Sequence, residues 1–167
     1  HGGSIILPRW SNDVHHEVEL VVVMGRSAKD LPEDRALDAI MGYTIGIDAT
    51  ARDVQAEAKK KGRPWAIAKG FDTSLPLGPL IVPSSDLDPH DLTISLRVNG
   101  STRQSSSTSD MIHNVERIVS FCSGMMTLER MDLIMTGTPS GVGKLNPGDV
   151  VEAEIEGIGV LRVNVSA

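Results

Sequence analysis

The apolar and polar positions along the chain predict a strand-rich fold with few helices. From Val14 to Met24 the segment VHHEVELVVVM is rich in β-branched residues and lacks glycine and proline, which predicts a buried strand. Residues 43–48, YTIGID, predict a second strand. Between the two, Pro32, the acidic residues after it and an apolar spacing of three and four predict a short helix over residues 32–41.

Another helix is expected after the second strand. Thr50 belongs to the residue types that cap helices, and the helix should continue to about Lys61, where Gly62 would end it. The region from Ser74 to Asp91 contains four prolines, so we expect a loop with an edge segment there.

A hairpin and a helix are predicted in the next part of the chain. LTISLRV is followed by Asn99-Gly100, a pair that suits a type I′ turn because both positions need a positive φ. The polar run at residues 105–109 should form a loop. From Asp110 to Met125 the apolar spacing predicts an amphipathic helix, capped by Asp110 or by the serine before it.

The C-terminal segment completes a strand-rich pattern. A short strand at residues 133–135 should lead into the glycine-rich turn 136–143, and the turn residues 146–149 should open a hairpin that runs to Val165. Together these elements predict an α+β, β-rich fold with two or three helices. A length of 167 residues matches one domain, so we expect residues 1–167 to form a single domain.

Composition and charge limit the classes of function. A content of 40% apolar and 23% charged residues is typical of soluble globular proteins, and no apolar run approaches the roughly 20 residues that span a bilayer. The net charge of −6 and the lack of a basic stripe argue against a nucleic-acid partner. Cys122 lies in an apolar helical pattern, so we expect this single thiol in the core and the protein in a reducing compartment.

Three acidic residues stand out in the predicted strands. Side chains alternate along a strand, so Glu17 and Glu19 should share one face, about 6.5 Å apart along the chain, and Asp48 ends the second strand. Burying two like charges is costly unless a cation satisfies both. Ligation by oxygen atoms alone favours Mg²⁺, with Mn²⁺ or Ca²⁺ as alternatives, over zinc.

A plainer explanation stays open at this point. Glu17 and Glu19 could lie on a solvated strand face, and Asp48 could merely begin a turn. Spacing alone favours this explanation, because short motifs of this kind often arise by chance.

Other polar residues lie close to these three in the sequence. Arg52 falls in the first turn of a predicted helix, where a cation opposes the helix dipole, so a nearby anion would explain its position. Gln55 lies one turn further on the same face, and both could hold a substrate carboxylate, orient the carboxylates or simply face solvent. Lys69 lies in the apolar stretch WAIAKGFD, where a buried ammonium needs a partner unless it reaches solvent.

Several other catalytic motifs are absent. The turn TGTPSGVGK lacks the penultimate glycine and the Ser/Thr of a phosphate loop, although it could bind a substrate. Neither a GxSxG elbow nor a catalytic-cysteine motif occurs in the chain. We interpret four histidines as structural or surface residues, namely His15, His16, His90 and His113.

Three segments resemble a known family. VHHEVELVVVMGR, GIDATARDVQAEAKKKGRPWAIAKGFD and DLIMTGTPSGVG are similar, in this order, to the fumarylacetoacetate hydrolase family, particularly its small acylpyruvate hydrolase and oxaloacetate decarboxylase branch. The resemblance extends from about Ser4 onward. It implies a mixed β-sheet roll or sandwich of that family's C-terminal-domain type, and a homodimer.

The resemblance also implies roles for residues. It assigns a Mg²⁺ or Mn²⁺ ion to Glu17, Glu19 and Asp48. It assigns substrate contacts to Arg52, Gln55, Lys69 and Thr138. Lys69 would in addition be catalytic, because its ammonium could stabilise a departing pyruvate enolate.

The implied function is a metal-dependent acylpyruvate hydrolase that cleaves a small 2,4-dioxo acid to pyruvate and a carboxylic acid, and that also decarboxylates oxaloacetate. Family members carry a further N-terminal segment with a mobile lid, whose His and Glu activate water; this sequence shows neither, so we expect the lid portion to be missing. Two alternatives are a 2-hydroxyhepta-2,4-diene-1,7-dioate-type isomerase and an inactive binding or assembly subunit. The expected location is the cytoplasm or the mitochondrion.

Overall fold

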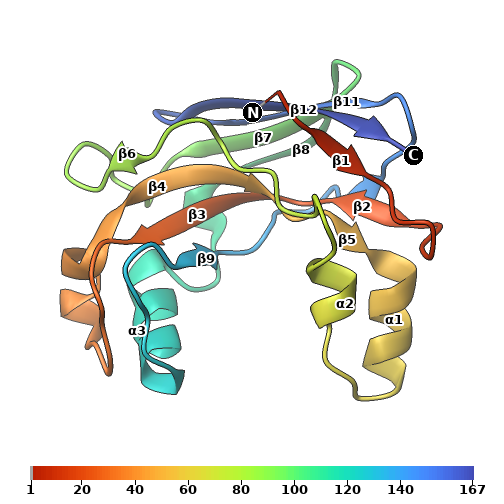
Figure 1. Cartoon of the computed structure of the whole chain (residues 1–167). Helices are drawn as coiled ribbons and strands as arrows, with labels where there is room; N and C mark the ends of the chain where they lie inside the picture. The colour runs from red at the N-terminus through yellow and green to blue at the C-terminus, as the bar shows by residue number, and fades with distance from the viewer. Residues whose placement is uncertain (1) are drawn as a thin grey trace.

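Two β-sheets pack face to face and enclose the hydrophobic core (Figure 1). The structure is a computed structural model of the chain and describes residues 2–167. The five-stranded sheet has the order β1-β12-β11-β7-β8, with strands Ser4–Ile6, Gly159–Ser166, Val150–Ile155, Thr93–Val98 and Ser101–Ser107. The four-stranded sheet has the order β6-β4-β3-β9, with strands Val82–Pro83, Ile40–Ile47, Val18–Met24 and Leu133–Met135.

A third, smaller sheet has the order β10-β2-β5, and its strands are Gly143–Lys144, Val14–His16 and Thr50–Ala51. Strand β1 pairs with β12 in parallel while the other pairs are antiparallel, so the five-stranded sheet is mixed. This arrangement confirms the predicted β-rich, mixed-sheet fold of the family's type.

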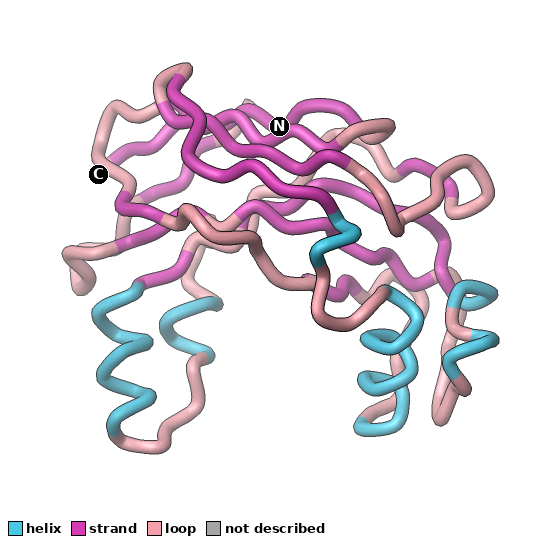
Figure 2. The backbone as a smooth tube through the Cα atoms, turned by 180° about the vertical axis from the view of Figure 1, so that it is seen from behind, coloured by secondary structure: helices cyan, strands magenta, loops and turns pink. Residues whose placement is uncertain are grey.

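The three α-helices of residues 2–167 project from the side of the four-stranded sheet that faces away from the five-stranded sheet (Figures 1 and 2). Helices α1 and α2 lie together and span Arg52–Lys60 and Ala66–Lys69, whereas α3 lies apart from them and spans Val115–Met125. Short 3₁₀ turns occur at Glu33–Arg35, Leu37–Ala39 and Thr108–Asp110. No helix in the part of the chain that the structure describes is both long and apolar enough to cross a membrane.

Several predicted elements are confirmed. Asn99 and Gly100 have φ values of 51° and 77° and join β7 to β8 as the type I′ signal predicts. The strand at 133–135 and the terminal hairpin β11–β12 also form. The proline-rich region 74–91 is a loop that contains only the short edge strand β6.

The predicted helix over residues 32–41 is wrong. Two 3₁₀ turns occupy its first part, and Ile40 and Met41 begin strand β4 instead. Ile40 pairs with Met24 at a register shift that skips Met41 of β4, and Gly25 N donates to Ala39 O over 2.7 Å. Strand pairing therefore outweighs the helical spacing of the apolar residues in this segment.

Two predicted boundaries around β8 and α3 are also wrong. The serine-rich run at 105–109 is not a loop, because β8 continues to Ser107 in register with β7. Backbone pairing at a sheet edge tolerates polar side chains that point to solvent. Helix α3 starts five residues later than Asp110, where the side chain of Asn114 accepts a hydrogen bond from Arg117 N.

Three differences from the predicted elements lie close to residues that the sequence singled out as candidate metal ligands or substrate contacts. Thr50 does not cap α1, because it lies in β5 and Ala51 occupies the cap position without a side-chain bond. Helix α2 was not predicted at all. The single strand predicted from Val14 to Met24 is two strands, β2 and β3, and Glu17 lies at the break between them.

Candidate metal centre

Three carboxylates meet where β2 passes into β3 beside the end of β4. Glu17 lies at the break between strands, Glu19 lies in β3, and Asp48 follows β4. One oxygen from each carboxylate lies within 4.8 Å of the others, and Asp48 N donates to Glu17 O over 2.8 Å. The first two residues are buried, with 6% and 4% of their surface exposed, which costs energy unless cations compensate.

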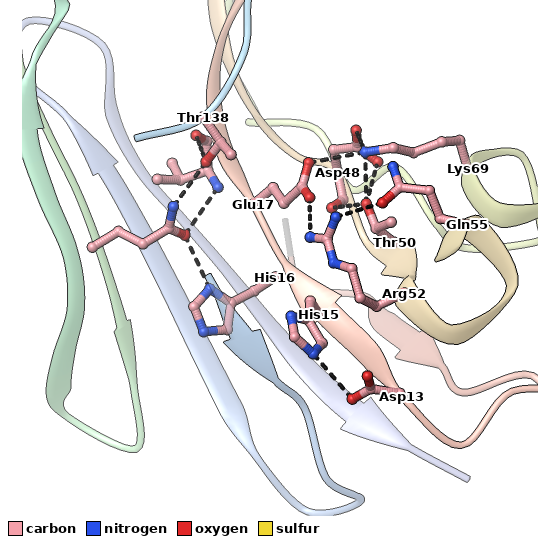
Figure 3. Close-up of polar contacts among 12 residues, drawn as sticks. Asp13, His15, His16, Glu17, Asp48, Thr50, Arg52, Gln55, Lys69 and Thr138 are labelled. Carbon is pink, nitrogen blue, oxygen red and sulfur yellow. Dashed lines mark hydrogen bonds and ion pairs between the residues drawn. The ribbon is translucent and has the colours of Figure 1, made fainter. Parts of the chain in front are cut away.

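Two basic side chains approach these carboxylates from α1 and α2 (Figure 3). Lys69 Nζ lies 2.9 Å from Glu17 Oε2 and also forms an ion pair with Asp48 Oδ2. Arg52 Nη2 forms an ion pair with the other oxygen of Glu17, and Arg52 Nη1 donates to Gln55 Oε1 over 2.7 Å. The structure thus brings together six residues that the sequence singled out: Glu17, Glu19, Asp48, Arg52, Gln55 and Lys69.

Thr50 joins this group although the sequence gave it another role. Its hydroxyl lies 2.6 Å from Lys69 Nζ and 3.3 Å from Asp48 Oδ1. It was expected to cap a helix. Its position in β5 instead points the hydroxyl toward Lys69. The preference of threonine for helix caps does not indicate such a contact.

The carboxylates differ in the direction of their pKa shifts. Burial raises the pKa of Glu17, but hydrogen bonds from Lys69 and Arg52 outweigh it, so the pKa lies below its usual value. Burial raises the pKa of Glu19 to about 7, against the opposing effect of a hydrogen bond from Gly137 N. Burial also raises the pKa of Asp48, and hydrogen bonding to Lys69 only partly opposes it.

This charge distribution fits a hard divalent cation. Three carboxylates face two cationic side chains, and Glu19 forms no ion pair with either of them. All the donor atoms are oxygens, the ligand set that Mg²⁺, Mn²⁺ and Ca²⁺ prefer. An ion held by the three carboxylates would give Glu19 the positively charged partner that neither Lys69 nor Arg52 provides.

Thr138 lies on the opposite side of Glu17 from Arg52 and Lys69, in the turn after β9 (Figure 3). Its hydroxyl donates to Val18 O over 2.8 Å and accepts from Gln104 Nε2 over 2.8 Å. The sequence did not indicate a role for Gln104, on β8, because the predicted return strand ended near it. A two-residue turn without a bulge would place Arg103 opposite the core residue Leu96, and the register shift between Leu96 and Arg97 brings Gln104 there instead.

The histidines beside the carboxylates make contacts with neighbouring polar groups. His15 Nε2 lies 3.0 Å from Asp13 Oδ1, and His16 Nδ1 lies 3.0 Å from Gln104 Oε1. Burial lowers the pKa of His16, so this ring is neutral at physiological pH. A cavity of 770 Å³ borders the turn 136–140 without being lined by any of the three carboxylates.

The chain is similar to enzymes with three different activities. It is 45% identical over 164 residues to the mitochondrial oxaloacetate tautomerase of Pongo abelii, covering 98% of this chain and 74% of that protein. The crystal structure of fumarylpyruvate hydrolase from Pseudomonas aeruginosa in complex with Mn²⁺ and pyruvate matches with a TM-score of 0.95 and 38% identity over 99% of this chain and 71% of that one. For 2-hydroxyhepta-2,4-diene-1,7-dioate isomerase from Mycobacterium marinum the TM-score is 0.92 and the identity 48%, over 99% and 63% of the two chains.

The chain therefore spans between 63% and 74% of these relatives. Its own residues 1–166 match the family described as fumarylacetoacetate (FAA) hydrolase C-terminal, which confirms the resemblance inferred from the three sequence segments. On these grounds the chain belongs to the fumarylacetoacetate hydrolase family.

Proposed function

We propose that the chain is the catalytic part of a divalent-metal-dependent acylpyruvate hydrolase, which cleaves a small 2,4-dioxo acid to pyruvate and a carboxylic acid. One observation carries the proposal, namely that the Lys69 ammonium lies directly against two of the three carboxylates that suit a cation. A fixed positive charge beside a cation site stabilises the negative charge that develops in an enolate of a 2-oxo acid. A hydrolase relative bound to Mn²⁺ and pyruvate supports the same reading.

Glu17, Glu19 and Asp48 would hold the ion, with Mg²⁺ or Mn²⁺ preferred and Ca²⁺ as an alternative. Such an ion, when bound, supplies Lewis acidity to the keto and carboxylate oxygens of a 2-oxo acid. Arg52 fixes the orientation of Glu17, because its guanidinium bonds both Glu17 and Gln55. The guanidinium has further N–H groups that could bind the substrate carboxylate, with Gln55 and Thr138 as further contacts.

Lys69 is suited to stabilise a developing negative charge rather than to remove a proton, because its ammonium is held protonated by its three partners. Burial lowers its pKa, but hydrogen bonds to Asp48 and Glu17 outweigh this effect and raise the pKa above its usual value. During hydrolysis, water adds to the distal carbonyl, the adjacent C–C bond breaks, and its electron pair passes into the pyruvate enolate. The ammonium stabilises this enolate, which then takes up a proton at carbon to give pyruvate.

A second candidate is proton transfer without cleavage, as in tautomerisation of oxaloacetate or isomerisation of a 2-hydroxydienoate. The same protonated Lys69 favours it, because these reactions pass through a related enolate and need no water. Decarboxylation of oxaloacetate also forms the pyruvate enolate. The relatives with tautomerase and isomerase activity support this candidate.

The test measures pyruvate release from acetylpyruvate, fumarylpyruvate and oxaloacetate by the purified chain, with Mn²⁺ or with EDTA. We expect pyruvate from an acylpyruvate only when Mn²⁺ is present. Conversion between enol and keto forms without pyruvate would favour the second candidate instead. If no substrate reacts in a metal-dependent way, the chain is not a catalyst of this class, and an inactive binding or assembly subunit becomes the better description.

Two further properties are proposals that follow from the family alone. We propose a homodimer, for which the molar mass in solution is the test. We also propose that the protein acts in the cytoplasm or in mitochondria; the similar protein of Pongo abelii is mitochondrial by its name.

A further inference from the structure

The backbone of Val18, which lies between Glu17 and Glu19, is held from one side by two polar side chains. Its N–H donates to Gln104 Oε1 over 3.2 Å, and its C=O accepts from Thr138 Oγ1 over 2.8 Å. Strand β9 pairs only with residues 21–23 of β3 and does not reach Val18. The two side chains therefore take the place of a neighbouring strand between the proposed metal ligands.

Gln104 uses all of its hydrogen-bonding capacity in this position and is only 1% exposed. Its Oε1 also bonds His16 Nδ1 over 3.0 Å, and its Nε2 donates to Thr138 Oγ1 over 2.8 Å and to Pro139 O over 2.9 Å. Val18 N can only donate and Pro139 O can only accept, so the amide has one permitted orientation. His16 must then carry its proton on Nδ1.

These bonds close a ring, because Thr138 accepts from Gln104 and donates to Val18 O. The ring is joined to Glu19 by the preceding residue of the same turn, since Gly137 N donates to Glu19 Oε2 over 2.7 Å. Further along the turn, Gly141 has a φ of 102°, and a Cβ there would lie 2.1 Å from Arg103 O. The turn is therefore pressed against β8 immediately beside Gln104.

We propose that Gln104 is a positioning residue of the metal centre, which sets the relative orientation of Glu17 and Glu19 by fixing Val18 and the turn 136–139. This inference rests on the proposed function, because it assumes that the two glutamates bind an ion. Its physical basis is that loss of the amide removes the partners of His16 Nδ1, Val18 N–H and Pro139 O, and one of the two partners of Thr138 Oγ1. The strand and the turn must then move or admit water. Partners that orient metal ligands typically change metal affinity by about 10–100-fold when they are replaced.

The test compares Mn²⁺ affinity, by electron paramagnetic resonance, with the melting temperature in EDTA for three variants. Gln104→Met removes all four hydrogen bonds, and Gln104→Glu keeps acceptors for His16 and Val18 but loses the donors to the turn. Thr108→Val is the control, because Thr108 is also a buried polar residue, beyond the end of β8, and its side chain accepts from Leu92 N.

We expect the Kd for Mn²⁺ to rise about 10-fold or more in Gln104→Met and by a smaller factor in Gln104→Glu. The control should lower the melting temperature and leave the Kd unchanged. A Kd in Gln104→Met within about threefold of wild type, with a lower melting temperature as in the control, would show a purely structural role and overturn the inference. If Gln104→Met does not fold, an unchanged Kd in Gln104→Glu overturns it, whereas absence of Mn²⁺ binding in the wild type overturns the proposed function as well.

Discussion

The ammonium of Lys69 lies 2.9 Å from Oε2 of Glu17 and forms a partly buried ion pair with it. The same ammonium bonds Asp48, so one side chain serves two of the three carboxylates at the proposed metal centre. A positive charge is therefore built into the site by the chain itself. A divalent ion bound by the same carboxylates would share them with Lys69, and this sharing makes the effects of a lysine substitution depend on the metal.

Replacing Lys69 with methionine should destabilise the metal-free protein more than the metal-bound protein. Without the ammonium, Glu17 and Asp48 lose a partner in a buried region, which is costly unless a cation takes its place. We expect a lower melting temperature in EDTA, recovery of most of the loss with Mn²⁺, and a large fall in kcat. Differential scanning fluorimetry with and without Mn²⁺ measures the first two effects.

Lys61→Met is the matched control for this experiment, because Lys61 forms an exposed ion pair with Glu57 one turn earlier on a helix end. Exposed pairs of this kind contribute little to stability, because solvent screens them. The control should leave the melting temperature and kcat almost unchanged. An equal loss of stability for Lys69→Met in EDTA and in Mn²⁺ would contradict the shared-ligand explanation.

Arg52→Lys should weaken metal binding as well as substrate binding. Arginine bonds Glu17 and Gln55 at once through two nitrogens of a planar group, and a lysine cannot reproduce this fork. We expect a higher Kd for Mn²⁺ by calorimetry together with a higher KM. A higher KM with an unchanged Kd would mean that Arg52 contacts the substrate and does not orient Glu17.

Metal affinity should increase with pH through about 7. Burial, with smaller contributions from Asp48 and Glu17, raises the pKa of Glu19 to about 7, and a bound ion needs this carboxylate ionised. Below that pH the proton competes with the ion, which lowers the affinity by about tenfold per pH unit. Mn²⁺ titrations between about pH 5.5 and about pH 8 test this, with Glu19→Gln as the variant in which the slope should be smaller.

The stability of the metal-free protein should change with pH in the opposite direction. Because the folded-state pKa of Glu19 lies above its unfolded value of 4.5, the protonated carboxyl stabilises the folded state at low pH. This contribution is complete below about 4.5 and is lost as pH rises through about 7. The stabilisation that Mn²⁺ provides should therefore grow over the same range, and a melting-temperature shift independent of pH would exclude Glu19 as a ligand.

The strands were predictable because their signals are local. β-branched residues and the lack of glycine and proline marked β3, the Asn99-Gly100 pair fixed a hairpin, and the turn residues 146–149 fixed another. The short elements failed because long-range pairing decides them. Ile40 joins β4 through its register with β3, and nothing near it in the sequence carries that information.

The candidate site also contains residues that the sequence indicates and a residue that it does not. Glu17, Glu19 and Asp48 could be selected because acidic residues are anomalous in buried strands, and the structure brings their oxygens together. Gln104 could not be selected in the same way, since it lies 86 residues from Val18 in the sequence and is polar in a segment that is polar throughout. Residues that orient ligands are recognised by their hydrogen bonds, which only the folded chain displays.

The most direct test of the central claim is a titration of the purified wild type and of Asp48→Ala with Mn²⁺, followed by electron paramagnetic resonance of the free ion. We expect one site in the wild type and loss of that site in Asp48→Ala, with the circular dichroism spectrum retained because Asp48 is partly exposed at a strand end. Glu57→Gln, which removes an exposed carboxylate on α1, should bind as the wild type does. Equal Mn²⁺ affinity in Asp48→Ala and the wild type would contradict the assignment of this carboxylate cluster as the metal centre.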